Sequence, residues 1–82
     1  MRLDKYLKVS RIIKRSTVAN EACDAGRVVV NGKIARASYD VKVNDVIELT
    51  LGARTVKARV VSVNEYAKKD EAAMMYEIIE EK

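Results

Sequence analysis

The spacing of apolar residues changes at Gly26, and this change constrains the fold more than any other feature of the chain. Before Gly26, apolar residues recur every three or four positions, as at Leu3 and Leu7, which predicts helices. After it they alternate with polar residues, as from Val56 to Val60, which predicts strands with one buried face. The sequence therefore predicts an α+β fold: two short N-terminal helices followed by a small, mostly antiparallel β-sheet.

The two helices occupy the first third of the chain. Ile12–Ile13 extend the apolar spacing of the first helix, with Ser10 as the candidate for a break or bend. Ser16 and Thr17 are both candidate N-caps of the second helix, and Gly26 fits its C-terminal stop. The expected apolar stripe of the second helix is Val18, Ala19, Ala22 and Cys23.

Two turn signals organise the rest of the chain. Asn31-Gly32 is a strong hairpin signal, because both residues tolerate positive φ, and it joins residues 27–30 to residues 33–35. Asn44-Asp45 is a second turn candidate. The remaining expected elements are an antiparallel pair at residues 46–51 and 56–60, one helical turn within 67–74 and a last strand at 76–79.

Size and composition limit the class of protein. Eighty-two residues suit a single domain, and because all four aromatic residues are Tyr, the core must be aliphatic. No apolar run approaches the roughly 20 residues that cross a bilayer, so no membrane partner is expected. Cys23 is the only cysteine, which excludes an intrachain disulfide and favours a reducing, cytoplasmic location.

Positive charge is concentrated in the first part of the chain. Residues 1–36 hold nine Lys and Arg against three Asp and Glu, a balance of +6, whereas residues 37–82 hold seven against nine, a balance of −2. Segregated charge attracts a polyanion, although exposed lysines can also serve solubility alone. We therefore expect a polyanionic partner.

The residues that most enzymes need are missing or scattered. Without His, a serine or cysteine nucleophile lacks its usual base, and one Cys cannot make a structural zinc site. The three glycines are isolated, which excludes a phosphate-cradling loop, and the adjacent acids Asp70-Glu71 and Glu80-Glu81 suit a solvated surface better than acid–base work. We expect no catalytic activity, no metal and no cofactor.

Basic residues recur every three or four positions near the N-terminus. On helices this spacing gathers side chains along one flank, and Arg15 beside Ser16 and Thr17 at a helix start suits phosphate. A solvated lysine-rich face is the alternative. The cluster comprises Arg2, Lys5, Lys8, Arg11, Lys14 and Arg15.

The same region favours folded RNA over DNA. After Asn20 and Glu21 the second helix offers Ala22, Cys23 and Asp24, a poor set for reading the major groove, so no DNA partner is expected. Four dispersed Tyr do not make the stacking platform of a single-strand binder. Backbone and shape recognition of structured RNA fits better.

An ordered set of motifs resembles the S4 RNA-binding domain. The motifs are RLDKYL at residues 2–7, RSTVA at 15–19, GRVVVNG at 26–32 and VNDV at 43–46. The resemblance implies the αL motif of S4 domains, with a core at about residues 2–50 and a C-terminal sheet extension over 51–82, all within one domain of residues 1–82.

The opening MRLDKYLKVSR and the ending EAAMMY at residues 71–76 are similar to a stand-alone bacterial family, RqcP or YabO, which is related to the ribosome-associated heat-shock protein family. This resemblance implies a factor of ribosome-associated quality control. Such a factor binds large-subunit ribosomal RNA and holds peptidyl-tRNA in the P site, while its partner RqcH recruits alanyl-tRNA to extend the stalled chain on the obstructed subunit.

Carried over by position, Arg2, Asp4, Lys5 and the Arg15-Ser16 pair would face ribosomal RNA and tRNA. Asp4 could orient a neighbouring basic side chain or cap its helix. Ser16 departs from the family, which has arginine there, and serine cannot make a bidentate charged contact. The full set of expected RNA-binding residues is Arg2, Asp4, Lys5, Lys8, Arg11, Lys14, Arg15, Ser16, Thr17, Arg27 and Lys33.

Three alternatives stay open. The first is another RNA function, such as rescue of free large subunits or ribosome assembly. The second is a protein-interaction module that uses the acidic C-terminal part, including Glu77, Glu80 and Glu81. The third is a subunit of an enzyme whose partner brings the catalytic residues.

Overall fold

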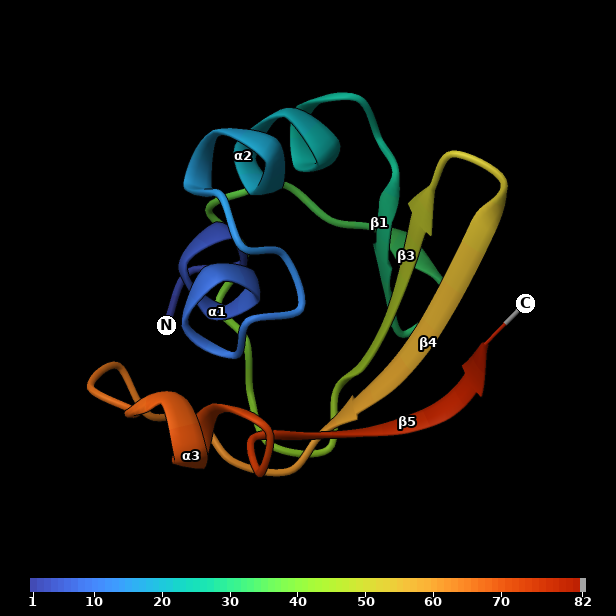
Figure 1. Ribbon diagram of the computed structural model, residues 1–82. Helices are drawn as coiled ribbons and strands as arrows, with labels where there is room; N and C mark the ends of the chain where they lie inside the picture. Colours follow the sequence, from blue (N-terminus) through green and yellow to red (C-terminus); the bar gives the residue numbers. More distant parts are fainter. Residues whose placement is uncertain (82) are drawn as a thin grey trace.

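Two helices pack on one side of a five-stranded sheet, and a short third helix precedes the last strand (Figure 1). The computed structural model describes residues 1–81, without the side chains of Ser16, Leu51 and Glu81. Every strand pairs antiparallel with its neighbours, in the order β2-β1-β3-β4-β5, which confirms the predicted α+β architecture. The elements are α1 (Leu3–Val9), α2 (Ser16–Asp24), β1 (Val28–Val30), β2 (Lys33–Ile34), β3 (Val46–Leu51), β4 (Arg54–Val60), α3 (Lys69–Ala72) and β5 (Tyr76–Glu81).

Helix α1 ends earlier than the apolar spacing suggested. Ser10 is its C-cap, and Arg11 follows in the left-handed region with φ of 63°. The break or bend expected at Ser10 is therefore present. Arg11 and the Ile12–Ile13 pair lie after the end of α1, so the prediction that they belong to this helix was wrong. Ile13 is nevertheless buried, because its amide donates to the Leu7 carbonyl at 3.0 Å and turns the chain back toward the core.

Helix α2 stops as predicted but starts differently. Gly26 has φ of 72°, and two hydrogen bonds close the helix in a Schellman motif: Arg27 N–H to the Ala22 carbonyl at 2.9 Å and Gly26 N–H to the Cys23 carbonyl at 3.1 Å. At the other end Arg15 is the N-cap, and its side chain makes no capping hydrogen bond. The expectation that Ser16 or Thr17 caps the helix was wrong, since both already lie within it.

The predicted hairpin at Asn31-Gly32 is present, with φ of 53° and 83° and Val30 paired to Lys33. Its tip is tied to the second predicted turn. The side-chain Nδ2 of Asn31 donates to Asp45 Oδ1 at 3.0 Å, and Asn31 Oδ1 accepts from the backbone amide of Val46 at 3.0 Å. Both turns therefore form one hydrogen-bonded unit beside β1 and β3.

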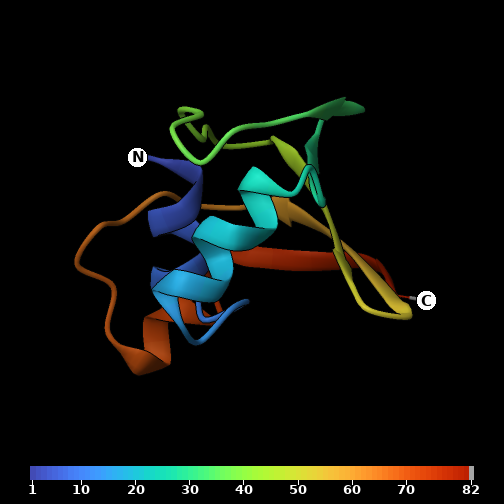
Figure 2. The same ribbon diagram turned by 90° about the horizontal axis from the view of Figure 1, so that it is seen from above.

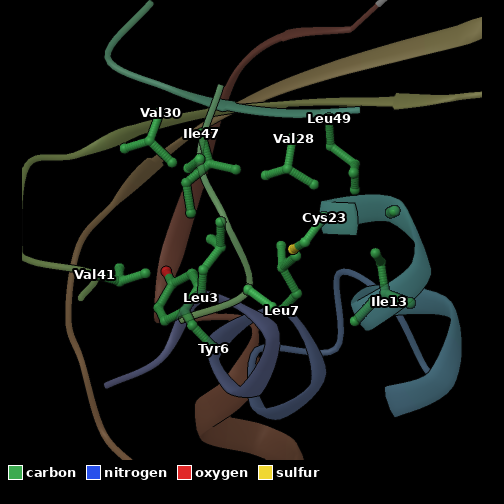
Figure 3. Packing of buried hydrophobic residues seen from close by; sticks show 14 of the residues in the cluster. Leu3, Tyr6, Leu7, Ile13, Cys23, Val28, Val30, Val41, Ile47 and Leu49 are labelled. Carbon is green, nitrogen blue, oxygen red and sulfur yellow. The ribbon is translucent and has the colours of Figure 1, made fainter. Parts of the chain in front are cut away.

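The core is mostly aliphatic, as predicted, but the fully buried Tyr6 also belongs to it, so the expectation of a purely aliphatic core was wrong at this residue (Figure 3). Leu3 and Leu7 of α1 are fully buried against strand residues such as Val28 and Ile47. Ala19, Ala22 and Cys23 of the expected α2 stripe are buried too. Val18, the fourth member, is 39% exposed and was wrongly placed in the core. It lies one position before Ala19, so the helix turns it about 100° away from the buried face.

The C-terminal segment packs against α1 on the side away from α2, and Figure 1 shows α1 between α2 and α3. The buried Tyr6 hydroxyl donates to the Met75 carbonyl at 2.8 Å, and burial raises the pKa of Tyr6 above its ordinary value. The expected helical turn and last strand are α3 and β5. The longest described helix has nine residues, and none in residues 1–81 could cross a membrane.

Candidate nucleic-acid interface

Four basic residues surround the turn between α1 and α2. Lys8 is in the last turn of α1, Arg11 and Lys14 lie in the connecting loop, and Arg15 is the N-cap of α2. All four side chains are exposed. They fall within eight consecutive residues, from Lys8 to Arg15, and we call them the turn cluster.

Arg2 is held at the opposite end of α1 by Asp4. The Arg2 Nε donates to Asp4 Oδ1 at 3.2 Å, and the same oxygen accepts the Lys5 amide at 2.9 Å. Asp4 therefore orients a neighbouring basic side chain, as predicted, and also satisfies one first-turn amide although it is not the N-cap residue. The ion pair leaves Arg2 well exposed, with 60% of its side chain accessible.

The N-terminus of α1 is not open to an anion. The Leu3 amide donates to the Tyr39 carbonyl at 2.8 Å, and the Asp4 amide donates to the Ala37 carbonyl at 3.2 Å. With the Lys5 amide on Asp4, the first three amides of the helix already have acceptors. Any phosphate near this end would have to be bound by side chains, chiefly that of Arg2.

Lys5 faces another part of the molecule. Its ammonium lies 3.7 Å from Glu65 Oε2, in the segment between β4 and α3. Asp4, the next residue back, instead borders a hollow of about 380 Å³ on α2 with Thr17, Asn20 and Glu21. The two neighbours thus point to different sides of α1, and the structure does not bring Lys5 together with Arg2.

A groove lies between α2 and the segment that follows β2 (Figure 2 shows the two elements from above). Its volume is about 520 Å³, and we call it the α2–β2 groove. Arg2 is the one expected RNA-binding residue that lines it; Arg27 and Lys33 are exposed near the hairpin but outside its lining. The groove is lined by Arg2, Asn20, Cys23, Asp24, Gly26, Ile34, Arg36, Ala37 and Ser38.

Arg36 is the residue that sequence reasoning missed. It belongs to the basic first part of the chain and follows the hairpin directly, so its charge was visible in the sequence. What the sequence could not show is that residue 36 and residue 2 line the same groove. Of the other expected residues, Thr17 is exposed on α2, and the side chain of Ser16 lies outside the described part of the structure.

Buried polar contacts fix the loop that carries Arg36. Asp45 is 9% exposed, and its Oδ2 accepts hydrogen bonds from the Tyr39 hydroxyl and the Lys42 amide, each at 3.0 Å. Burial, and then the hydrogen bond to Asp45, raise the pKa of Tyr39, so the phenol stays a donor at neutral pH. The loop between β2 and β3 is therefore anchored from within.

Comparison with known proteins identifies the family. The S4 domain family matches residues 1–47. The chain is 56% identical over 81 residues to the RQC P-site tRNA stabilizing factor of Streptococcus pneumoniae, which covers 99% of this chain and 92% of the relative. It is 49% identical over 81 residues to the protein of the same name from Bacillus subtilis, covering 99% and 94%.

Among solved structures, the fold is similar to heat shock protein 15 of Vibrio cholerae, described as trimeric. The TM-score is 0.86 at 26% sequence identity, with 95% of this chain and 80% of that chain covered. The match includes the C-terminal strands as well as the part that the S4 domain family matches, which fits the predicted relationship to the heat-shock family. The chain therefore belongs to the S4 domain family and, within it, to the family of RQC P-site tRNA stabilizing factors.

Proposed function

We propose that this chain is a non-catalytic, cytoplasmic RNA-binding factor of ribosome-associated quality control. It binds large-subunit ribosomal RNA and stabilises peptidyl-tRNA in the P site of an obstructed subunit, where RqcH extends the stalled chain with alanine. Residues 1–82 act as one RNA-binding domain, with the S4 core at about 2–50 and the remaining strands as its extension. Relatives named RQC P-site tRNA stabilizing factor support the quality-control and P-site tRNA parts of this proposal.

The observation that carries the proposal is the turn cluster. Lys8, Arg11, Lys14 and Arg15 are exposed, and no ion pair among the described residues neutralises them. Exposed, unpaired cations on a short helical connection can contact phosphates of an RNA backbone, and they act by charge alone. The factor therefore restrains tRNA without a covalent step.

The test is cosedimentation with large subunits that carry peptidyl-tRNA, over a range of salt concentrations. If the turn cluster and Arg2 together engage about four phosphates, the log–log slope of affinity against salt should be on the order of −3. Arg2→Ala and Arg15→Ala should each weaken binding and reduce the slope by about one. Neither change removes a capping hydrogen bond, so the fold should persist.

Lys69→Ala is the matched control, because Lys69 is an exposed lysine of α3 that is not among the expected RNA-binding residues. It should leave both the affinity and the slope unchanged. Binding that is insensitive to salt, or unchanged in both arginine variants, would contradict the electrostatic mechanism. Equal binding to vacant subunits would favour rescue of free subunits or ribosome assembly instead.

A further inference from the structure

We propose that the α2–β2 groove is a nucleotide subsite that takes one unpaired guanosine of the bound RNA. The inference rests on the proposed function and adds a base-specific contact to it. A volume of about 520 Å³ is within the usual range for a small-molecule site and accommodates one nucleotide. Three features of the lining support it: an apolar wall, a free carboxylate and two guanidinium groups.

The apolar wall is built around Ile34. This side chain is 70% exposed on the two-residue edge strand β2, although isoleucine ordinarily avoids water. Gly26 lies beside Ile34, since a Cβ added at Gly26 would be 3.8 Å from Ile34 Cγ2, an ordinary van der Waals contact. Buried Cys23 and Ala37 complete the apolar part. Such a surface suits the flat face of a base.

The polar part of the lining comes from Asn20, Asp24 and Ser38. Within residues 1–81, none of these three side chains takes part in a hydrogen bond or ion pair, so each can bind a ligand. The Watson–Crick edge of guanine carries two adjacent donors, N1–H and the N2 amino group. A carboxylate offers two adjacent acceptors, and Asp24 therefore matches guanine as a bidentate pair.

The charges of the groove favour a single nucleotide over a continuous backbone. Arg2 and Arg36 can each contact a phosphate, as guanidinium groups commonly do. Asp24 would repel a phosphate placed beside it, so a run of phosphates along the groove is disfavoured. With the base at Asp24 and its phosphate at Arg2 or Arg36, both the carboxylate and the phosphate meet hydrogen-bond donors.

The experiment is a titration of the ¹⁵N-labelled full chain with GMP, AMP, CMP and UMP, followed by amide chemical shifts. GMP should shift the amides of Asn20, Gly26 and Ala37 and bind at least about fivefold tighter than the other three nucleotides. Asp24→Asn should remove this preference, because the amide places a donor opposite one guanine donor. Glu21→Gln is the control: the same helix carries Glu21, but it borders the neighbouring hollow instead.

Three results would overturn the subsite. The first is equal affinity for all four nucleotides. The second is no change in the amide chemical shifts of the groove residues at nucleotide concentrations up to about 10 mM, which is well above a millimolar Kd. The third is an unchanged preference for GMP in Asp24→Asn. Cosedimentation of the wild-type chain with large subunits is measured in parallel. If it binds subunits but shows no GMP preference, only the subsite is wrong; if it does not bind subunits, the proposed function itself fails.

Discussion

Replacing Asp45 tests how the hairpin and the loop that carry Lys33 and Arg36 are fixed. The carboxylate is buried and accepts three hydrogen bonds, each of 3.0 Å. Oδ1 accepts from the side-chain Nδ2 of Asn31, and Oδ2 accepts from the Tyr39 hydroxyl and the backbone amide of Lys42. These hydrogen bonds are disrupted to an increasing extent in the variants Tyr39→Phe, Asp45→Asn and Asp45→Ala.

The expected losses follow from the number of broken bonds. Tyr39→Phe breaks one and should lower the free energy of unfolding by about 1 kcal/mol. In Asp45→Asn the remaining oxygen can keep Tyr39 and Lys42, while the new amide opposes the Asn31 amide, for a loss of about 1–2 kcal/mol. Asp45→Ala leaves all three donors without the carboxylate and should cost about 3–5 kcal/mol. The total free energy of unfolding expected for a chain of this length is about 4–12 kcal/mol.

Urea denaturation followed by far-UV circular dichroism measures these free energies. In thermal melts each kcal/mol should lower Tm by about 4–8 °C. The order of the three losses in free energy of unfolding matters more than any single value, because that order reflects how far the hydrogen bonds to Asp45 are disrupted. An Asp45→Ala chain that loses no more stability than Tyr39→Phe would refute the reasoning.

Two further variants or reagents test other parts of the structure. Arg11→Gly removes a non-glycine residue from the left-handed region, which relieves about 1 kcal/mol of backbone strain in the folded chain. The glycine also makes the unfolded chain more flexible, which opposes this gain. The free energy of unfolding measured in urea should therefore change by less than about 1 kcal/mol. The same variant should weaken cosedimentation with large subunits, and a large stability loss with unchanged binding would contradict both points. Burial raises the pKa of Cys23 to about 11, so at pH 8 its alkylation by iodoacetamide should be far slower in the folded chain than in urea; equal rates would show that the thiol is accessible.

Local signals in the sequence predicted much of the fold because they act over a few residues. The Asn31-Gly32 turn needs positive φ at both residues, and Gly26 ends α2 for the same reason. The alternation in residues 46–60 matches the observed pairing of β3 with β4. Each of these features depends on backbone preference or periodicity, which the sequence displays directly.

Features set by contacts between distant residues were not predictable in this way. Arg11 takes the position that glycine usually occupies, so nothing in its identity marks the end of α1. Lys5 looks like a free member of the basic cluster, yet its ammonium lies 3.7 Å from a carboxylate oxygen of Glu65, sixty positions away. Arg2 and Arg36 line the same groove because the loop after β2 returns to α1, and the sequence does not display that return.

The most direct test of the central claim is to purify the tagged chain from cells and identify the particle and RNA that accompany it. The proposed function predicts large ribosomal subunits that carry peptidyl-tRNA, in a complex that nuclease treatment disrupts. Arg15→Ala should recover less of this particle than Lys69→Ala does. Recovery of a protein partner that resists nuclease, with no large subunit or tRNA, would contradict the account.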